Sequence, residues 1–183
     1  NCNWKTANFR NNLQQTVQKN WPNHRLAFSS SDIGIELALH DYLPGGTCTM
    51  AFDHLGMPVV KVGEDDSGMG RWSYITVEGQ DKRRVTFITG YRICSGAMKG
   101  TTTSCSQQRR VLENQEMKRG VKTSTPDTNY LRQKFIEDLT RFIIALQEEG
   151  HAIILGLDAN ETPDETTKND ITRPGSITKL LED

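Results

Sequence analysis

The last third of the chain places a long amphipathic segment directly before a short apolar run, and this order constrains the fold most. In residues 129–149 the apolar positions recur at helical spacing, Asp127 or Thr128 can cap the first turn, and Gly150 ends the segment. Residues 152–155 are continuously apolar, which is typical of a strand buried on both faces. A long helix feeding a buried strand predicts a layered domain of class α/β (α+β).

Earlier segments add strands and helices to this unit. Residues 72–77 and 85–89 are two β-branched and aromatic runs around a Gly/Asp loop, which predicts a hairpin. Further short strands are expected at 25–28, 47–52 and 57–62, and a helix at 4–21, which Pro22 ends. The polar stretch 93–128 is expected to be a long excursion with one helix near 107–120.

Composition narrows the class of protein. The 183 residues carry 22 Lys plus Arg against 23 Asp plus Glu, so the net charge of −1 gives no electrostatic footprint for nucleic acid over the whole surface. No apolar run approaches the ~20 residues that span a bilayer, so we expect no membrane partner. The four cysteines show no zinc-binding spacing. A glycosylation sequon at Asn160 overlaps the best candidate site, and we interpret it as coincidental, which favours an intracellular protein.

The strongest candidate site follows the apolar run. Asp158 and Asn160 stand two residues apart where the predicted strand ends, and open α/β sheets bind ligands at such ends. If the extended backbone continues, both side chains point the same way and offer a carboxylate and an amide to a hard cation or an attacking water. The alternative is an Asx turn that closes the strand.

Three further residues can contact phosphate. Tyr91 and Arg92 end the second strand of the predicted hairpin, where a hydroxyl and a guanidinium together could hold a phosphate group. Arg71 enters the first strand of the hairpin, after Glu64-Asp65-Asp66, an acidic run that could form a second metal site. The alternatives are a half-buried packing role for Tyr91, an ordinary salt bridge for Arg71 and a solvated turn for the three acids.

Taken in order, these motifs resemble the endonuclease/exonuclease/phosphatase superfamily, which includes DNase I-like nucleases. The resemblance rests on Gly-Arg-Trp opening a strand, Tyr91-Arg92 closing another, a long helix, and an apolar strand running into Asp-x-Asn. The segments 43–47 and 90–92 look most like the mobile-element endonuclease branch. The chain departs from the family by inserting Leu157 before Asp158 and by placing Ala159 where an aromatic residue is usual. The family's early metal-binding Glu and late Asp-His pair are missing.

The resemblance implies that residues 1–183 are the central part of one such domain, a two-sheet β-sandwich flanked by helices in a DNase I-like four-layer architecture, incomplete at both ends. It implies metal-dependent phosphodiester hydrolysis of DNA or RNA, with Mg²⁺ or Mn²⁺ held by Asp158 and Asn160. Tyr91, Asp158 and Asn160 would be catalytic, and Arg71 and Arg92 would contact phosphate.

Two alternatives stay open at this point. The chain could be a non-catalytic binding scaffold of the same fold, or a phosphatase acting on a small phosphorylated molecule. Without the missing Glu and Asp-His we expect this chain by itself to be inactive. The geometric expectation common to the enzyme interpretations is that Tyr91, Asp158 and Asn160 converge on one rim of a sheet, with Arg71 nearby.

Overall fold

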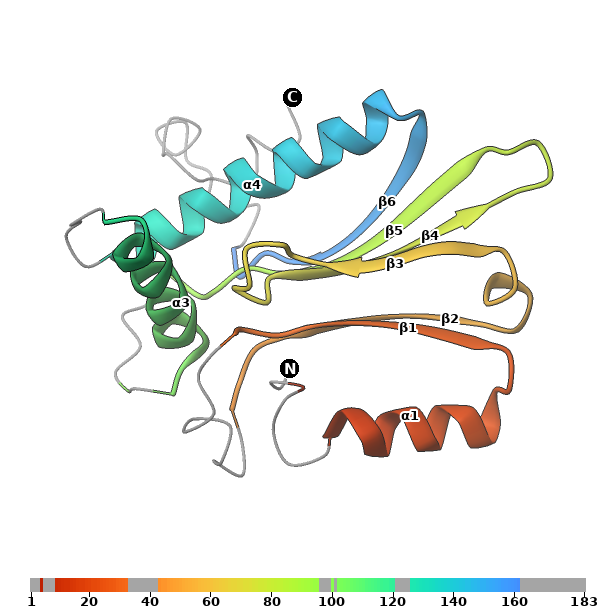
Figure 1. Cartoon of the computed structure of the whole chain (residues 1–183), viewed down its shortest axis with the longest axis horizontal. Coiled ribbons are helices and arrows are strands. Elements are labelled where there is room, and N and C mark those ends of the chain that lie inside the picture. Colours follow the sequence, from red (N-terminus) through yellow and green to blue (C-terminus); the bar gives the residue numbers. More distant parts are fainter. Residues whose placement is uncertain are drawn as a thin grey trace.

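A computed structural model describes residues 4, 9–32, 43–95, 100, 102–120 and 126–161. Within them the chain forms three α-helices and two β-sheets, so the expected mixed α/β class is confirmed (Figure 1). The elements in chain order are α1 (Phe9–Asn20), β1 (His24–Ser29), β2 (Thr47–Phe52), the 3-10 turn η1 (Asp53–Leu55), β3 (Val59–Glu64), β4 (Trp72–Glu78), β5 (Arg84–Tyr91), α3 (Ser104–Lys118), α4 (Thr128–Glu148) and β6 (His151–Asp158).

The larger sheet has the order β3-β4-β5-β6. The strands β4 and β5 pair antiparallel from Trp72 opposite Gly90 to Glu78 opposite Arg84, which confirms the predicted hairpin. The strands β5 and β6 pair parallel, because the chain crosses back through α3 and α4 before it re-enters the sheet. A parallel pair brings the carboxyl ends of β5 and β6 to the same edge, which is where the candidate residues lie.

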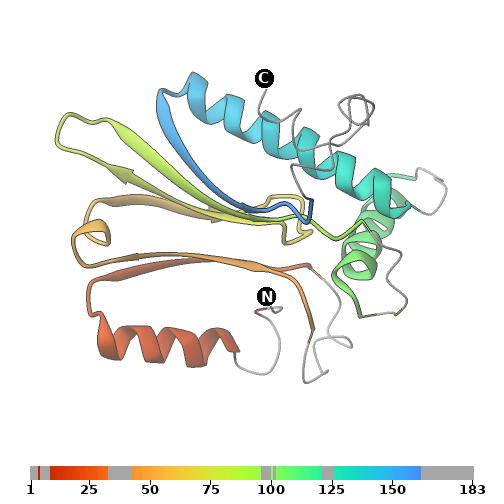
Figure 2. The ribbon, with the colours of Figure 1, turned by 180° about the vertical axis from the view of Figure 1, so that it is seen from behind.

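The smaller sheet, β1 paired antiparallel with β2, lies face to face with the larger one (Figures 1 and 2). Ala27 and Ala51 from the small sheet form one buried cluster with Ile75 and Val77 from β4. A buried polar contact also crosses between the sheets, since Thr49 Oγ1 donates to the Ser73 carbonyl oxygen at 2.9 Å. The side chains between the sheets therefore form one of the protein's apolar cores.

The helix α4 covers the other face of the larger sheet. Asp127 caps it by accepting a hydrogen bond from the Tyr130 backbone N–H at 2.7 Å, and Gly150 follows its end with φ +82°. Its apolar stripe, which includes Phe135 and Leu139, packs against Trp72 of β4. The helix α1 lies along the outer side of the small sheet (Figures 1 and 2).

The strand β6 differs from its prediction. Exposure alternates along it, and Ile154 keeps 52% of its surface, so the expected burial on both faces is wrong. Ile153 and Leu155 pack against the cluster under α4, whereas Ile154 points to the opposite face. Among the described strands β6 is also an edge of its sheet. An apolar run can thus mark a strand with only one covered face.

The segment between β3 and β4 is fixed to the end of β1. Ser31 forms an isolated antiparallel bridge with Met69, and Ser31 Oγ donates to the Met69 carbonyl oxygen at 2.9 Å. The next residue, Gly70, has φ +71°, and a Cβ atom there would lie 2.3 Å from backbone atoms of Ser30 and Ser31. Only glycine fits this close approach. The contact orients Arg71, which follows immediately.

Candidate functional site

Tyr91 and Asp158 meet at one rim of the larger sheet. They are register partners at the carboxyl ends of the parallel strands β5 and β6. Paired residues in a sheet direct their side chains to the same face, so the phenol and the carboxylate leave the sheet side by side. Tyr91 is half-buried and packs against the cluster that contains Leu43 and Ile93, while Asp158 is exposed. One packed hydroxyl-bearing ring and one accessible carboxylate therefore stand next to each other.

A groove leads along the same face towards this pair. It has a volume of about 430 Å³ and lies between β2 and the strands β5 and β6. Thr89 and Gly156 line it, and each stands two residues before Tyr91 and Asp158 on its strand. Most other lining residues are apolar, including Met50 and Ile154. The site's polar groups are thus confined to the rim end of the groove.

Asn160 takes a different position from the one its spacing predicts. The strand β6 ends at Asp158, and Asn160 has φ +48°, so the extended conformation does not continue. Asn160 N donates to Asp158 Oδ1 at 3.2 Å, which is the Asx turn of the alternative interpretation. The Asn160 amide donates to the Arg92 carbonyl oxygen at 2.6 Å and accepts from Cys94 Sγ at 3.2 Å. Asn160 therefore ties the turn after β6 to the chain after β5.

Arg92 is buried beneath this turn. Its side chain is 2% exposed, and its Nη1 lies 2.5 Å from Glu161 Oε2. Arg132 of α4 donates to the Ile93 carbonyl oxygen and approaches the same Glu161 oxygen at 3.8 Å. Burial lowers the pKa of Arg92, and the hydrogen bond and charge of Glu161 act in the opposite direction. The Glu161 carboxylate therefore links the ends of β5 and β6 to α4.

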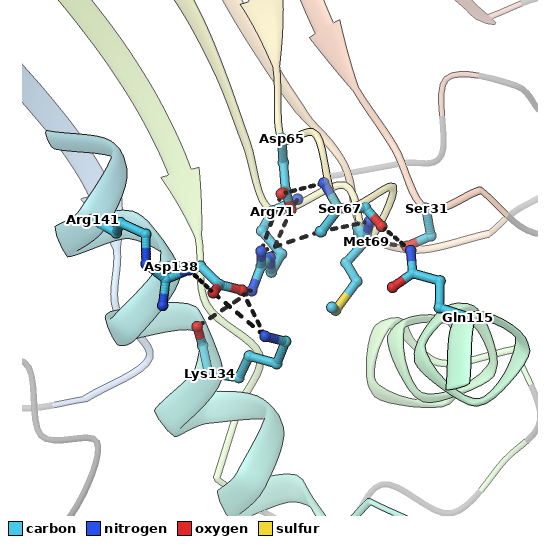
Figure 3. A network of polar contacts seen from close by, with 9 residues as sticks. All are labelled: Ser31, Asp65, Ser67, Met69, Arg71, Gln115, Lys134, Asp138 and Arg141. Carbon is cyan, nitrogen blue, oxygen red and sulfur yellow. Dashed lines mark hydrogen bonds and ion pairs between the residues drawn. The ribbon is translucent and has the colours of Figure 1, made fainter. Parts of the chain in front are cut away.

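Arg71 lies at the same end of the sheet, and its carbonyl oxygen accepts from Tyr91 N at 2.8 Å. Its guanidinium, however, lies between Asp65 and Asp138 (Figure 3), at 2.6 Å from Asp65 Oδ2 and 2.9 Å from Asp138 Oδ2. Burial lowers the pKa of Arg71, but the bonds and charges of Asp65 and Asp138 outweigh it, so this pKa lies above its ordinary value. These contacts favour the salt-bridge alternative for Arg71 over phosphate contact.

The Arg71 network opens onto a second cleft of about 670 Å³ between α3, α4 and the segment before β4. Lys134 and Arg141 of α4 both approach Asp138, each at 3.3 Å, and Gln115 of α3 donates to the Ser67 carbonyl oxygen (Figure 3). Acidic and basic side chains are mixed along this cleft. It therefore lacks the one-sided charge that a polyanion track requires.

The residues expected to bind magnesium are Asp158 and Asn160. Among the described residues, no group of three or more His, Cys, Asp or Glu side chains is arranged to hold a metal ion. Asp158 offers one accessible carboxylate, whereas the Asn160 amide is committed to Arg92 and Cys94. Mg²⁺ often binds through one or two carboxylates and keeps several waters. Asp158 suits such a ligand role.

Sequence reasoning missed three residues of this rim and its surroundings. Arg132 looks like an ordinary polar residue of a helix, and Glu161 follows the motif without any pattern of its own. Asp65 belongs to an acidic run that is typical of a solvated turn, yet the residue is only 3% exposed. The one available signal was the adjacency of Glu161 to Asn160.

Two further findings concern similar proteins and membrane-spanning helices. It matches none of the protein-family models and none of the curated proteins with which it was compared. Within the described residues, none of the helices has the length and apolar character needed to cross a membrane.

Proposed function

We propose that this chain is part of a single DNase I-like domain of the endonuclease/exonuclease/phosphatase type, and that this domain hydrolyses phosphodiester bonds in nucleic acid with a divalent cation. Two facing sheets, with α1 outside one and α4 outside the other, support this fold (Figure 1). The four-layer arrangement of such a domain requires that order of elements. The order of the motifs along the chain is the second support.

The observation that carries the proposal is the pairing of Tyr91 with Asp158. The two residues are 67 positions apart in sequence, yet they are register partners at the ends of adjacent strands. An accessible carboxylate beside a phenol is a set of groups that phosphodiester hydrolysis can use. Asp158 would orient or deprotonate the attacking water, and Tyr91 would donate a hydrogen bond to a non-bridging phosphate oxygen.

The other expected residues have supporting roles in this proposal. Asn160 holds the turn that carries Asp158, through its bonds to the Arg92 carbonyl oxygen and to Cys94. Mg²⁺ or Mn²⁺, when bound, supplies positive charge against the phosphate, and Asp158 would contribute one of its ligands. Arg71 is left out of the phosphate-contacting set because two carboxylates hold its guanidinium.

A substrate panel tests the proposal. Supercoiled plasmid, single-stranded RNA and inositol phosphates are each incubated with the protein in Mg²⁺ and in excess chelator. We expect chelator-sensitive cleavage of nucleic acid, in a form of the protein that also supplies the family's Glu and Asp-His. Release of phosphate from inositol phosphates without nucleic acid cleavage would favour the phosphatase alternative. Absence of all three activities would favour the binding scaffold.

A further inference from the structure

The groove between the two sheets is lined in two different ways. From β2 it is lined by consecutive residues, Cys48–Phe52. Neighbouring residues of a strand point to opposite faces, so β2 contacts the groove through its edge. From the larger sheet it is lined mainly by alternate residues, which are Ile75 and Val77 of β4, Phe87 and Thr89 of β5, and Ile154 and Gly156 of β6. The edge of the small sheet is therefore the side of the groove, and one face of the larger sheet is its floor.

The small sheet is too narrow to cover the larger one. The strand β1 lies over β3 and β4, and β2 lies over β4 and β5. On β6 the Ile154 side chain keeps 52% of its surface. Neighbouring strands of a sheet lie about 4.8 Å apart. One further strand beside β2 would therefore lie over β5 and β6 and would cover Ile154.

The edge of β2 has hydrogen-bonding groups for such a strand. Among the described strands β2 pairs with β1 alone. In an antiparallel pair, alternate residues direct their backbone N–H and C=O groups away from the partner strand. Along residues 49–51 these groups point towards the groove, where an extended backbone can pair with them.

The strand edges beside the groove lack the features that usually prevent strand addition. Such features include charged side chains and β-bulges. The strand β2 contains no charged residue, and neither do residues 152–157 of β6. On the opposite side of the molecule, β1 carries Arg25, and β3 carries Lys61 and a register shift after Val59. Among the described strands, the two edges without these features are those beside the groove.

The lining of the groove indicates the chemistry of the added strand. None of the lining residues is charged, although charged residues make up 25% of the chain. Ile75 and Val77 line the groove and also belong to the buried cluster between the sheets, so the groove continues an interface that the protein already forms. Apolar side chains at alternate positions of the strand would extend this cluster. The residues between them would face away from the larger sheet and can be polar.

We propose that the groove binds an extended peptide segment, which adds to the edge of β2 as a third strand of the small sheet. The segment carries uncharged, β-branched residues at alternate positions, and these pack on Phe87 and Ile154. Backbone pairing gives the affinity in this mode of recognition, and the alternate side chains give the specificity. The inference does not depend on the proposed hydrolysis, because it uses neither Tyr91 nor Asp158.

The test is binding of a fluorescent peptide by the full 183-residue chain, followed by anisotropy. The probe is a synthetic peptide with the core Thr-Val-Thr-Val-Thr-Val, flanked by lysines for solubility. The comparison peptide has the same composition with the valines and threonines in two separate blocks, so its valines cannot all face the floor of the groove. We expect the comparison peptide to bind at least about tenfold more weakly. Equal affinity for the two peptides would contradict the proposal.

Two N-methylated forms of the alternating peptide distinguish strand pairing from adsorption to an apolar surface. One form is methylated at the backbone nitrogens of the valines, and the other at those of the threonines. In an extended peptide one of these sets points towards β2 and the other points away from it. We expect one form to lose binding and the other to keep most of it. Equal effects of the two methylations would overturn strand addition.

Protein variants test the position of the peptide. Ile154→Lys places a charge on the floor of the groove, so we expect the affinity for the alternating peptide to fall at least about tenfold. Val62→Lys is the matched control, because Val62 is 47% exposed on β3, the other edge strand of the same sheet, and lies outside the groove. Its affinity should equal that of the wild type. If Ile154→Lys does not fold, Ile154→Thr replaces it and should also bind more weakly than the wild type. Equal affinity in the variants at positions 154 and 62 would overturn the proposal.

Sedimentation of the wild type shows whether a second copy of the chain occupies the groove instead. The protein is centrifuged with and without the alternating peptide. A monomer that binds the peptide, or a dimer that the peptide dissociates, agrees with the proposal. A dimer that excludes the peptide, or a monomer that does not bind it, would overturn the proposal.

Discussion

Tyr91 and Asp158 are register partners at the carboxyl ends of β5 and β6, so a phenol and a carboxylate leave one face of the sheet side by side. This pairing depends on the parallel crossover through α3 and α4, because an antiparallel β6 would bring its other end to this rim. The candidate site is therefore a consequence of topology as much as of the residues themselves.

The pairing predicts a selective cross-link. Neighbouring strands lie about 4.8 Å apart, which is within the range of Cα separations that a disulfide bridges. In a Cys94→Ser background, Tyr91→Cys with Asp158→Cys should therefore form a disulfide on mild oxidation, as seen by peptide mass mapping. Tyr91→Cys with Leu157→Cys is the control, since the Leu157 side chain packs on the α4 side. Equal yields from both pairs would contradict the register.

The Arg71 network predicts a large effect of mutation on the free energy of unfolding. Asp65→Asn leaves a 1% exposed guanidinium without one of its two carboxylates, and breaking a buried pair in this way costs about 3–5 kcal/mol. Urea unfolding measures this loss. Glu78→Gln breaks the half-exposed pair with Arg84 and should cost about 1 kcal/mol or less. A similar small loss for both variants would show that the Arg71 network is not structural.

The close approach of Gly70 to the end of β1 predicts that any side chain at position 70 destabilises the fold. Gly70→Ala places a Cβ atom 2.3 Å from Ser30 and Ser31 at a positive φ, so we expect a loss of about 2–4 kcal/mol from strain and overpacking. Gly79→Ala is the control, because its Cβ would meet only the Arg83 carbonyl oxygen at 3.7 Å. Thermal unfolding of the two variants should differ clearly. Indistinguishable midpoints would mean that β1 does not approach Gly70 so closely.

The exposed face of β6 predicts self-association. Ile154 is 52% exposed on a strand that is an edge among those described, and apolar edges favour contact with other chains. Ile154→Lys should lower the associated fraction in analytical ultracentrifugation, while the free energy of unfolding changes by about 0.5 kcal/mol or less, as for a surface site. Lys134→Ile, which adds an apolar residue elsewhere, serves as the comparison. Unchanged association in Ile154→Lys would rule out this face as its cause.

Local patterns were sufficient to predict most elements. The expected strand 47–52 has the bounds of β2, and the expected helix 129–149 lies within one residue of α4 at each end. Helix caps, glycine stops and side-chain periodicity all depend on residues that are close together in the sequence. The strand expected at 57–62 is shifted by two residues, since β3 runs from Val59 to Glu64. Its first residue, Val59, pairs with Val77 of β4, a contact that is distant in sequence.

Long-range contacts account for what the sequence could not predict. The apolar run in β6 gave no sign that its Ile154 side would lack cover. The spacing of Asp158 and Asn160 predicted a shared direction, but Asn160 adopts a positive φ and bonds to the Arg92 carbonyl oxygen across 68 residues. The contacts of Arg132 with Ile93 and Glu161 likewise depend on how α4 crosses the sheet.

The most direct test of the proposed function is metal-dependent cleavage of plasmid by a form of the protein that carries the Glu and the Asp-His pair of the proposed endonuclease type. Wild type, Asp158→Asn, Tyr91→Phe and the control Asp81→Asn, an exposed carboxylate in the β4–β5 loop, are compared at saturating Mg²⁺. The account predicts losses of at least about 10²-fold for Asp158→Asn and Tyr91→Phe, with folding intact, and no loss for Asp81→Asn. Full chelator-sensitive activity in Asp158→Asn would contradict it.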